Sequence, residues 1–227
     1  MERYQVIDTK MPREFLLLQG TGCRWHKCGF CDYHADTSDA PFVVNKPVLD
    51  KVEGIYGVLD IINSGSAVEL DPQTVSYIRK VVQDKQIHTL WFESHYMYRH
   101  HLESFANQFA PAVVKFRCGV ETFDPVLRKQ WNKGIPDDVD AEELAKHFKG
   151  VCLLCCTRGE SKQRIVSDIE TARRYFEYFS VNLFCNNTTA VKRDEDLVKW
   201  FIQEVYPALK NEPGIEVLIN NTDLGVG

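Results

Sequence analysis

The chain of 227 residues lacks any apolar run long enough to cross a membrane. A membrane-spanning helix needs about 18 or more consecutive apolar residues, so we expect no membrane partner. The first residues, MERYQVIDTKMPRE, also lack the apolar core of a secretory signal. Without an export signal, the eight cysteines indicate thiols in a reducing compartment. We therefore expect a cytoplasmic protein.

The sequence also lacks an excess of positive charge and any segment that resembles a linker. Its formal net charge is −5, without a basic stripe. Proteins that wrap nucleic acid neutralise phosphates with clustered lysine and arginine, so we expect no nucleic-acid partner. No Pro/Gly/Ser-rich stretch, low-complexity run or internal repeat divides the chain, which predicts a single domain over residues 1–227.

What the chain does contain is a cluster of three cysteines near its N-terminus. Cys23, Cys28 and Cys31 have the spacing C-x4-C-x2-C, and no fourth cysteine is nearby. Three thiolates without a fourth partner suit a cubane iron–sulfur cluster with one iron open to a small ligand. His26 lies among them, so a closed Cys3His zinc site is an alternative interpretation. The hydrophobic content of 44% is enough for a core without a zinc ion, which favours the cluster.

Strands and helices are expected to alternate along the rest of the chain. Seven apolar runs rich in Val, Leu and Ile are typical of buried parallel strands, and they predict an α/β fold. The predicted strands are Glu14–Gln19, Val58–Asn63, Thr89–Ser94, Val113–Val120, Val151–Thr157, Val181–Asn186 and Glu216–Asn220. The predicted amphipathic helices are Pro72–Asp84, Ser161–Phe179 and Asp194–Tyr206. For Ala35–Tyr56 we expect a loop with a short turn of helix.

Polar, ionisable and glycine residues gather directly after the predicted strands. The carboxyl ends of parallel strands share one edge, where α/β barrel enzymes place their active sites. The candidates at this edge are Ser64, Gly65, Ser66, Glu93, His95, Glu121, Arg158, Asn187 and Asp223. Loops are polar in any protein. Glu93 and Glu121, however, directly follow apolar strand residues, which an ordinary loop explains poorly.

The cysteine motif resembles that of the radical S-adenosylmethionine superfamily. Members of that superfamily bind a four-iron cluster through three cysteines in the loop after the first strand, usually spaced C-x3-C-x2-C. An aromatic residue precedes the third cysteine, and here that residue is Phe30. This chain has one additional residue between Cys23 and Cys28, which requires a different path of the loop.

Other motifs extend the resemblance over nearly the whole chain, from Glu14 to Asp223. The family's glycine-rich motif after the second strand resembles Asn63–Ser66. Its acidic residue after the fourth strand resembles Glu121, which a helix and the segment Trp131–Gly134 follow. The fold that the resemblance implies is a partial (β/α)6-type TIM barrel, with a parallel sheet and a C-terminal strand.

The resemblance also implies a cofactor pair and a reaction type. Cys23, Cys28 and Cys31 would bind a [4Fe-4S] cluster whose open iron chelates S-adenosylmethionine. A reduced cluster would cleave S-adenosylmethionine to a 5′-deoxyadenosyl radical, with electrons from a donor such as flavodoxin or ferredoxin. The residues implied in cofactor binding are the backbone near Phe30 at the adenine, Gly65 and Ser66 at the amino group with Ser64 beside them, Glu121 at the ribose hydroxyls and Arg158 at the carboxylate.

Within the superfamily, the compact chain with its NSGSAVELD and NNTDLGVG segments is most similar to queuine lyases. Those enzymes cleave the C–N bond of queuine and release 7-aminomethyl-7-deazaguanine. The resemblance implies a small substrate of the 7-deazaguanine type, bound by Glu14, Glu93, His95, Asn187 and Asp223. Two alternatives stay open. One is a radical enzyme acting on another 7-deazapurine or nucleoside-like molecule, and the other is a non-catalytic Cys3His zinc-binding α/β protein.

Overall fold

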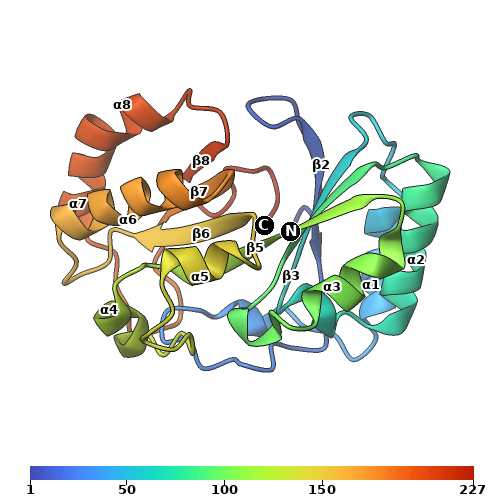
Figure 1. Ribbon diagram of the computed structural model, residues 1–227, viewed down its shortest axis with the longest axis horizontal. Helices are drawn as coiled ribbons and strands as arrows, with labels where there is room; N and C mark the ends of the chain where they lie inside the picture. Colours follow the sequence, from blue (N-terminus) through green and yellow to red (C-terminus); the bar gives the residue numbers. More distant parts are fainter. The chain divides into compact units, whose positions relative to one another are not determined.

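The computed structural model describes residues 1–227, which form two compact units. Unit 1 contains residues 1–26, 33–116 and 224–227, and unit 2 contains residues 27–32 and 117–223. Figure 1 shows most of unit 1 in blue to green and most of unit 2 in green to red. The single domain expected over residues 1–227 stays a prediction.

Unit 1 contains four strands, which follow each other in the sheet in chain order. Strand β1 (Tyr4–Ile7) pairs antiparallel with β2 (Arg13–Leu18), and β3 (Val58–Asn63) and β4 (Thr89–Glu93) continue in parallel. Strands β2, β3 and β4 confirm the first three predicted strands to within one residue at each end. The sequence does not predict β1, because four residues that include a glutamine and a tyrosine give no apolar run.

The helices of unit 1 are α1 (Pro41–Leu49), α2 (Pro72–Asp84) and α3 (Leu102–Ala106), and Figure 1 shows them grouped together. Helix α2 has the predicted bounds, and the N-cap Asp71 accepts a hydrogen bond from the backbone N–H of Thr74. Helix α1 is longer than the short turn expected. Two prolines obscure it in the sequence, but Pro41 starts the helix, where a missing N–H costs nothing. Short 3-10 segments are η1 (Tyr33–Ala35), η2 (Ala67–Glu69), η3 (Tyr96–Tyr98) and η4 (Asn107–Phe109).

Strand β5 (Val113–Glu121) is divided between the units. Its residues 113–116 belong to unit 1, and the rest of the strand belongs to unit 2. Strands β6 (Gly150–Cys155), β7 (Tyr178–Leu183) and β8 (Ile215–Leu218) follow in parallel. Strand β7 ends three residues before its predicted end at Asn186. The apolar run misleads there, because Phe184 leaves the ladder and packs into a separate aromatic cluster.

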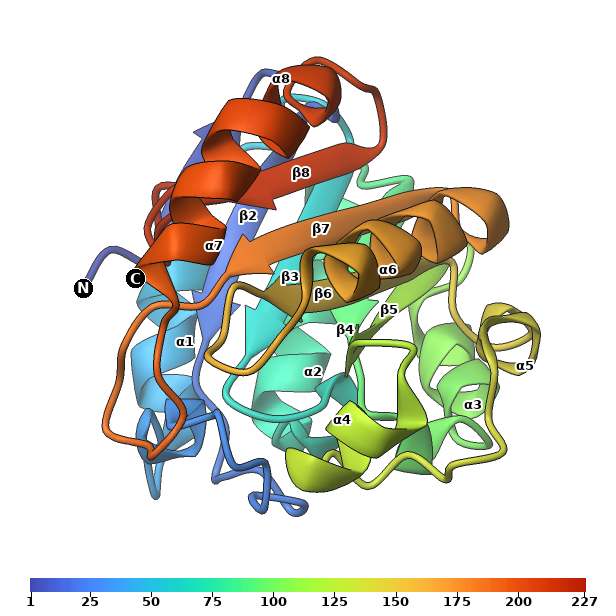
Figure 2. The same ribbon diagram turned by 90° about the vertical axis from the view of Figure 1, so that its left-hand side faces the viewer.

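Figure 2 shows α6 (Lys162–Tyr175) in front of β6 and β7, against which it packs. The other helices of unit 2 are α4 (Pro125–Gln130), α5 (Ala141–Ala145), α7 (Glu195–Trp200) and α8 (Tyr206–Leu209). A π-helical turn, η5 (Phe201–Val205), joins α7 to α8. None of the helices is long and apolar enough to span a membrane.

Candidate active site

In unit 1, two buried serines connect the loops at the carboxyl ends of the strands. Ser64 Oγ accepts a hydrogen bond from the backbone N–H of Gly20, 3.0 Å away in the segment after β2. Ser66 Oγ accepts one from the N–H of His95, 3.0 Å away after β4. The predicted glycine-rich motif therefore lies between the segments that precede Cys23 and follow Glu93.

Glu69 is a hydrogen-bond acceptor for three separate segments of unit 1. Its carboxylate accepts from the N–H of Arg24 at 2.9 Å, from the N–H of Ser66 at 2.6 Å and from the Tyr98 hydroxyl at 2.7 Å. A Cβ at position 65 would lie 2.7 Å from Glu69 Oε2, so any larger residue there would displace the carboxylate. Glu69 thus fixes the cysteine segment against the glycine-rich motif.

The next two candidates, Glu93 and His95, lie at the carboxyl end of β4. Glu93 is half-buried at the end of the strand. The His95 ring stacks on Trp25 with 5.5 Å between ring centroids, and its Nδ1 accepts the N–H of Met97 at 3.1 Å. Because Nδ1 accepts, the proton of the neutral ring is on Nε2, which is then a donor.

The additional residue of the cysteine motif is accommodated by a tight turn after Cys23. His26 has a positive φ of 29°, a backbone conformation that residues other than glycine rarely adopt. The turn directs the His26 N–H at Cys23 Sγ, 3.4 Å away, and the His26 ring at the Cys23 carbonyl. An N–H directed at the sulfur stabilises the thiolate that iron binds.

In unit 2, backbone contacts hold the segment that carries Cys28 and Cys31. The N–H of Gly29 donates to the Trp131 carbonyl at 2.8 Å, and Asn132 Nδ2 donates to the Lys27 carbonyl at 3.0 Å. Asn187 Nδ2 donates to the Phe30 carbonyl at 2.7 Å. The Trp131–Gly134 segment and the loop after β7 therefore both position this part of the cysteine loop.

An aromatic cluster lies behind Cys28 and Cys31. Its buried members are Phe30, Leu127, Trp131 and Phe184, and both cysteines pack against them. This apolar wall lies behind two of the three thiols of the motif, and thiols are the donors that iron–sulfur clusters use. Such a wall limits access of water, which is one way in which proteins set the potential of a cluster.

Glu121 forms a buried ion pair with Lys133. Glu121 Oε1 lies 2.7 Å from Lys133 Nζ, and both side chains are 10% exposed. Burial alone would lower the pKa of Lys133, but the Glu121 carboxylate outweighs this effect and raises the pKa above its usual value. Lys133 Nζ also lies 5.5 Å from the centroid of the Phe30 ring. The candidates for adenine and ribose contacts are therefore neighbours in unit 2.

The structure does not bring Glu14 to the edge where the other unit 1 candidates lie. Glu14 is fully buried near the start of β2, at the amino ends of the parallel strands. Its carboxylate accepts the Tyr4 hydroxyl and three N–H groups, of Glu53, Gly54 and Ile55, from the segment before β3. These bonds make Glu14 a structural anchor of that segment.

Three candidates of unit 2 lie after their strands as predicted, but in different settings. Arg158 is exposed, and its backbone N–H donates to the Lys192 carbonyl. Besides its bond to Phe30, Asn187 accepts from the N–H and hydroxyl of Thr189. Asp223 caps the turn after β8 through the N–H groups at positions 219 and 220. The polar atoms of Asn187 and Asp223 thus bind the protein itself.

Sequence reasoning overlooked Glu69 and Lys133. The sequence does contain a pattern that indicates the role of Glu69. Ser66 and Glu69 form the Ser-x-x-Glu pattern of a capping box, and the structure contains this capping box. Lys133 had none. It is 12 positions from Glu121 in the chain, and only the fold shows that the two charges meet.

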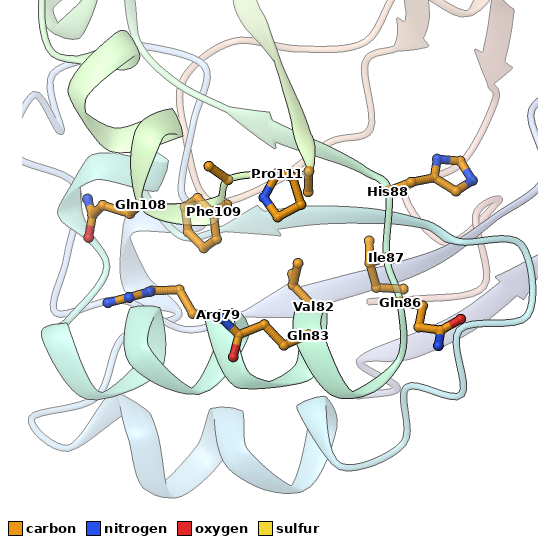
Figure 3. Close-up of a pocket in the computed structure, with 11 residues that line it drawn as sticks. Arg79, Val82, Gln83, Gln86, Ile87, His88, Gln108, Phe109 and Pro111 are labelled. Atoms are coloured by element: carbon orange, nitrogen blue, oxygen red, sulfur yellow. The ribbon is translucent and has the colours of Figure 1, made fainter.

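A separate cavity of about 390 Å³ lies elsewhere in unit 1. Figure 3 shows it between the last turns of α2 and the segment after α3, with Val82, Ile87 and Phe109 in its wall. His88, also in the wall, directly precedes β4, so the cavity lies at the amino end of that strand. It is not part of the candidate active site, whose unit 1 residues follow the carboxyl ends.

A solved structure matches this chain over its full length. The structure of queuine lyase from Clostridium spiroforme bound to SAM and queuine matches with a TM-score of 0.94 and 39% identity, over 100% of this chain and 99% of that chain. Streptococcus suis SuiB bound to precursor peptide SuiA matches with a TM-score of 0.57 and 14% identity, over 92% and 49%, and shares the fold alone. No family model and no curated protein matches. The full-length match confirms the expected α/β partial-barrel fold.

Proposed function

This chain belongs to the queuine lyase family of radical S-adenosylmethionine enzymes, and we propose that it cleaves the C–N bond of queuine to release 7-aminomethyl-7-deazaguanine. The observation that carries the proposal is the 39% identity over the full length of a queuine lyase bound to SAM and queuine. The likeness covers the whole chain, which supports the same reaction type for this protein. It also rejects the non-catalytic zinc-binding alternative.

The cofactors of this family are a [4Fe-4S] cluster and S-adenosylmethionine, and Cys23, Cys28 and Cys31 would hold the cluster. Together the two cofactors supply a 5′-deoxyadenosyl radical that removes a hydrogen atom from the substrate. The chain's own residues bind and orient the reactants and exclude water. The hydrogen bond to Cys23 Sγ and the aromatic wall behind Cys28 and Cys31 support this assignment.

The residues around the cysteine loop would orient S-adenosylmethionine. Phe30 would contact the adenine, the Ser64–Ser66 segment would bind the amino group, and Glu121 would accept the ribose hydroxyls. The place of Ser64, Ser66 and Glu121 at the carboxyl ends of β3 and β5 supports these roles, because α/β barrel enzymes bind their ligands at that edge. Arg158 is exposed, so its pairing with the carboxylate requires the cofactor to reach the protein surface.

Glu93 and His95 are the best supported substrate residues. A 7-deazaguanine presents N–H donors on one edge, which the half-buried Glu93 carboxylate would accept. The Nε2–H of His95, whose tautomer is fixed by Met97, would donate to a substrate oxygen. Glu14, Asn187 and Asp223 would act indirectly, since their side chains bind backbone groups of the protein.

The partner of the enzyme is a small molecule, and we propose flavodoxin or ferredoxin as the electron donor. Both deliver electrons one at a time, which the one-electron reduction of a four-iron cluster requires. A reducing cytoplasm would also keep the cysteines as thiols.

The test is anaerobic reconstitution with iron and sulfide, followed by reduction and addition of S-adenosylmethionine with and without queuine. Mass analysis should show 5′-deoxyadenosine that increases with queuine, together with 7-aminomethyl-7-deazaguanine. Formation of 5′-deoxyadenosine with queuine intact would reject queuine as the substrate and keep the radical chemistry. A colourless protein that forms no 5′-deoxyadenosine would reject the radical chemistry as well.

A further inference from the structure

We propose that Lys133 is a positioning residue that fixes the direction and charge of Glu121 for the ribose of S-adenosylmethionine. The inference rests on the proposed function, because it takes the ribose hydroxyls as the ligand of Glu121. The two side chains form a buried ion pair, with 2.7 Å between Lys133 Nζ and Glu121 Oε1. Removing one partner of such a pair leaves a buried charge, which is strongly unfavourable.

The backbone of Glu121 shows that its direction is specially arranged. The pairing of β5 with β6 shifts register between Gly119 and Glu121, which is typical of a β-bulge. Glu121 itself has a φ of 68°, in the left-handed region that a glutamate rarely adopts. A bulge with a strained residue redirects a side chain, and such strain is concentrated at functional sites.

Lys133 reaches Glu121 from a segment that is equally constrained. Its neighbours Asn132 and Gly134 have φ values of 53° and 74°, so the chain turns sharply on both sides of the lysine. The Lys133 N–H donates to the Arg128 carbonyl at 3.0 Å. The same segment binds the cysteine loop through Asn132, so Lys133 is held in a fixed relation to Phe30.

The ion pair changes what Glu121 recognises. S-adenosylmethionine carries a positive sulfonium, and a carboxylate without a counter-charge attracts it from many directions. The ammonium of Lys133, 2.7 Å from the carboxylate, cancels this attraction at longer range. The carboxylate then recognises its ligand through directed hydrogen bonds from hydroxyls, which the ribose supplies.

The experiment compares two nucleosides that differ only in the hydroxyls. Calorimetry on the cluster-free protein would measure binding of 5′-methylthioadenosine and of its 2′,3′-dideoxy analogue. We expect the wild type to bind the ribose compound at least about tenfold more tightly, since hydrogen bonds to an ionised group are lost in the analogue. In Lys133→Met the two affinities should become similar, and Lys133→Arg should restore most of the difference.

The matched control is Lys146→Met. Lys146 is exposed, and its Nζ lies 2.8 Å from Glu143 Oε2 in the same unit. This variant therefore removes a lysine–glutamate ion pair that lies at the surface. It should leave the affinity ratio unchanged. Lys133→Gln, which retains a donor without the charge, gives the same measurement if Lys133→Met does not fold. The double variant with Glu121→Gln should show the same ratio as Glu121→Gln alone, because Lys133 acts through Glu121.

Two results would overturn the inference. An unchanged ratio of the two affinities in Lys133→Met would show that Glu121 recognises the ribose without Lys133. An equal loss of affinity for both nucleosides would show that Lys133 has a purely structural role. The measurement contains no queuine, so it is independent of the proposed substrate. A wild type that discriminates the nucleosides but does not cleave queuine would reject the proposed substrate and leave the role of Lys133 intact.

Discussion

Glu69 accepts hydrogen bonds from three segments of unit 1, so its removal should loosen all three. Glu69→Ala would leave the N–H groups of Arg24 and Ser66 without their acceptor. Bonds to charged groups contribute about 1.5–3 kcal/mol each and are not additive, so we expect a loss of about 2–3 kcal/mol in urea unfolding. Glu103→Ala on the exposed face of α3 is the control and should change stability little.

Gly65→Ala should reproduce the effect of the Glu69 variant without touching the carboxylate. The added methyl would lie 2.7 Å from Glu69 Oε2 and 3.3 Å from the Gly22 carbonyl, so Glu69 must move away from the cysteine segment. We expect reconstituted Gly65→Ala to bind S-adenosylmethionine more weakly in equilibrium dialysis. Wild-type affinity in this variant would mean that the segment does not depend on the position of Glu69.

Two buried carboxylates of unit 2 make stability depend on pH. Burial raises the pKa of Asp168 to about 6 and that of Glu160 to about 7. Because the folded state binds these protons more tightly than the unfolded state, their contribution is complete at low pH. It is lost as the pH rises through the raised pKa values, between about pH 4 and 7.

Asp168→Asn should therefore stabilise the protein at pH 8 and flatten its pH dependence. In the wild type, Asp168 Oδ1 accepts the Phe123 N–H at 2.8 Å. The asparagine side chain keeps an oxygen that can accept this bond, but it carries no charge that must be buried. One pKa unit corresponds to about 1.4 kcal/mol, so the gain is at most about 3 kcal/mol. Urea unfolding at several pH values measures it, with the exposed Asp138→Asn as control. Parallel curves for wild type and Asp168→Asn would contradict the assignment.

At the level of elements, the sequence predicts strands well where an apolar run ends in polar turn residues. Strand β3 has its predicted bounds for this reason. Helix α2 has its predicted bounds because Asp71 caps it and Pro72 starts it. The helix predicted to end at Tyr206 continues to Leu209 instead. Pro207 has no N–H for the helical ladder, which normally ends a helix, but the π-helical turn before it accommodates the missing bond.

Some residues of the candidate site are identified by short motifs in the sequence, and others only by contacts between distant segments. The cysteine triplet and the Ser64–Ser66 segment are contiguous motifs, so the sequence alone identifies them. The pairing of Lys133 with Glu121 depends on how a bulge and a loop meet, which no local pattern encodes. The same holds for Asn187, whose partner Phe30 is 157 positions away.

The loop after β7 offers a test at the scale of an element. Asn187→Ala removes the 2.7 Å hydrogen bond to the Phe30 carbonyl, so the Cys28–Cys31 segment should become more mobile. We expect the reconstituted variant to lose its iron faster to a chelator. Asp223→Ala disrupts only the turn after β8 and should lose iron at the wild-type rate. Equal rates for wild type and Asn187→Ala would show that the loop does not hold the cysteine segment.

At the scale of the whole molecule, we expect the fold to form without the cluster. Each unit has a core of aliphatic and aromatic side chains from its own strands and helices, such as Leu16 and Ile61 in unit 1 and Val151 and Phe179 in unit 2. The three cysteines of the motif are only half-buried. Small domains that need a metal ion to fold lack such cores.

Cys28→Ala should therefore separate folding from function. A typical substitution costs about 1 kcal/mol, which lowers Tm by roughly 2–4 °C in a chain of this size. The circular dichroism spectrum of this half-buried position's variant should be unchanged. The brown colour of the cluster and the cleavage of S-adenosylmethionine should both be lost. Cys185→Ala, a half-buried cysteine outside the motif, should keep both. A Cys28→Ala protein that unfolds would indicate a structural metal, and one that still cleaves S-adenosylmethionine would remove Cys28 from the ligand set.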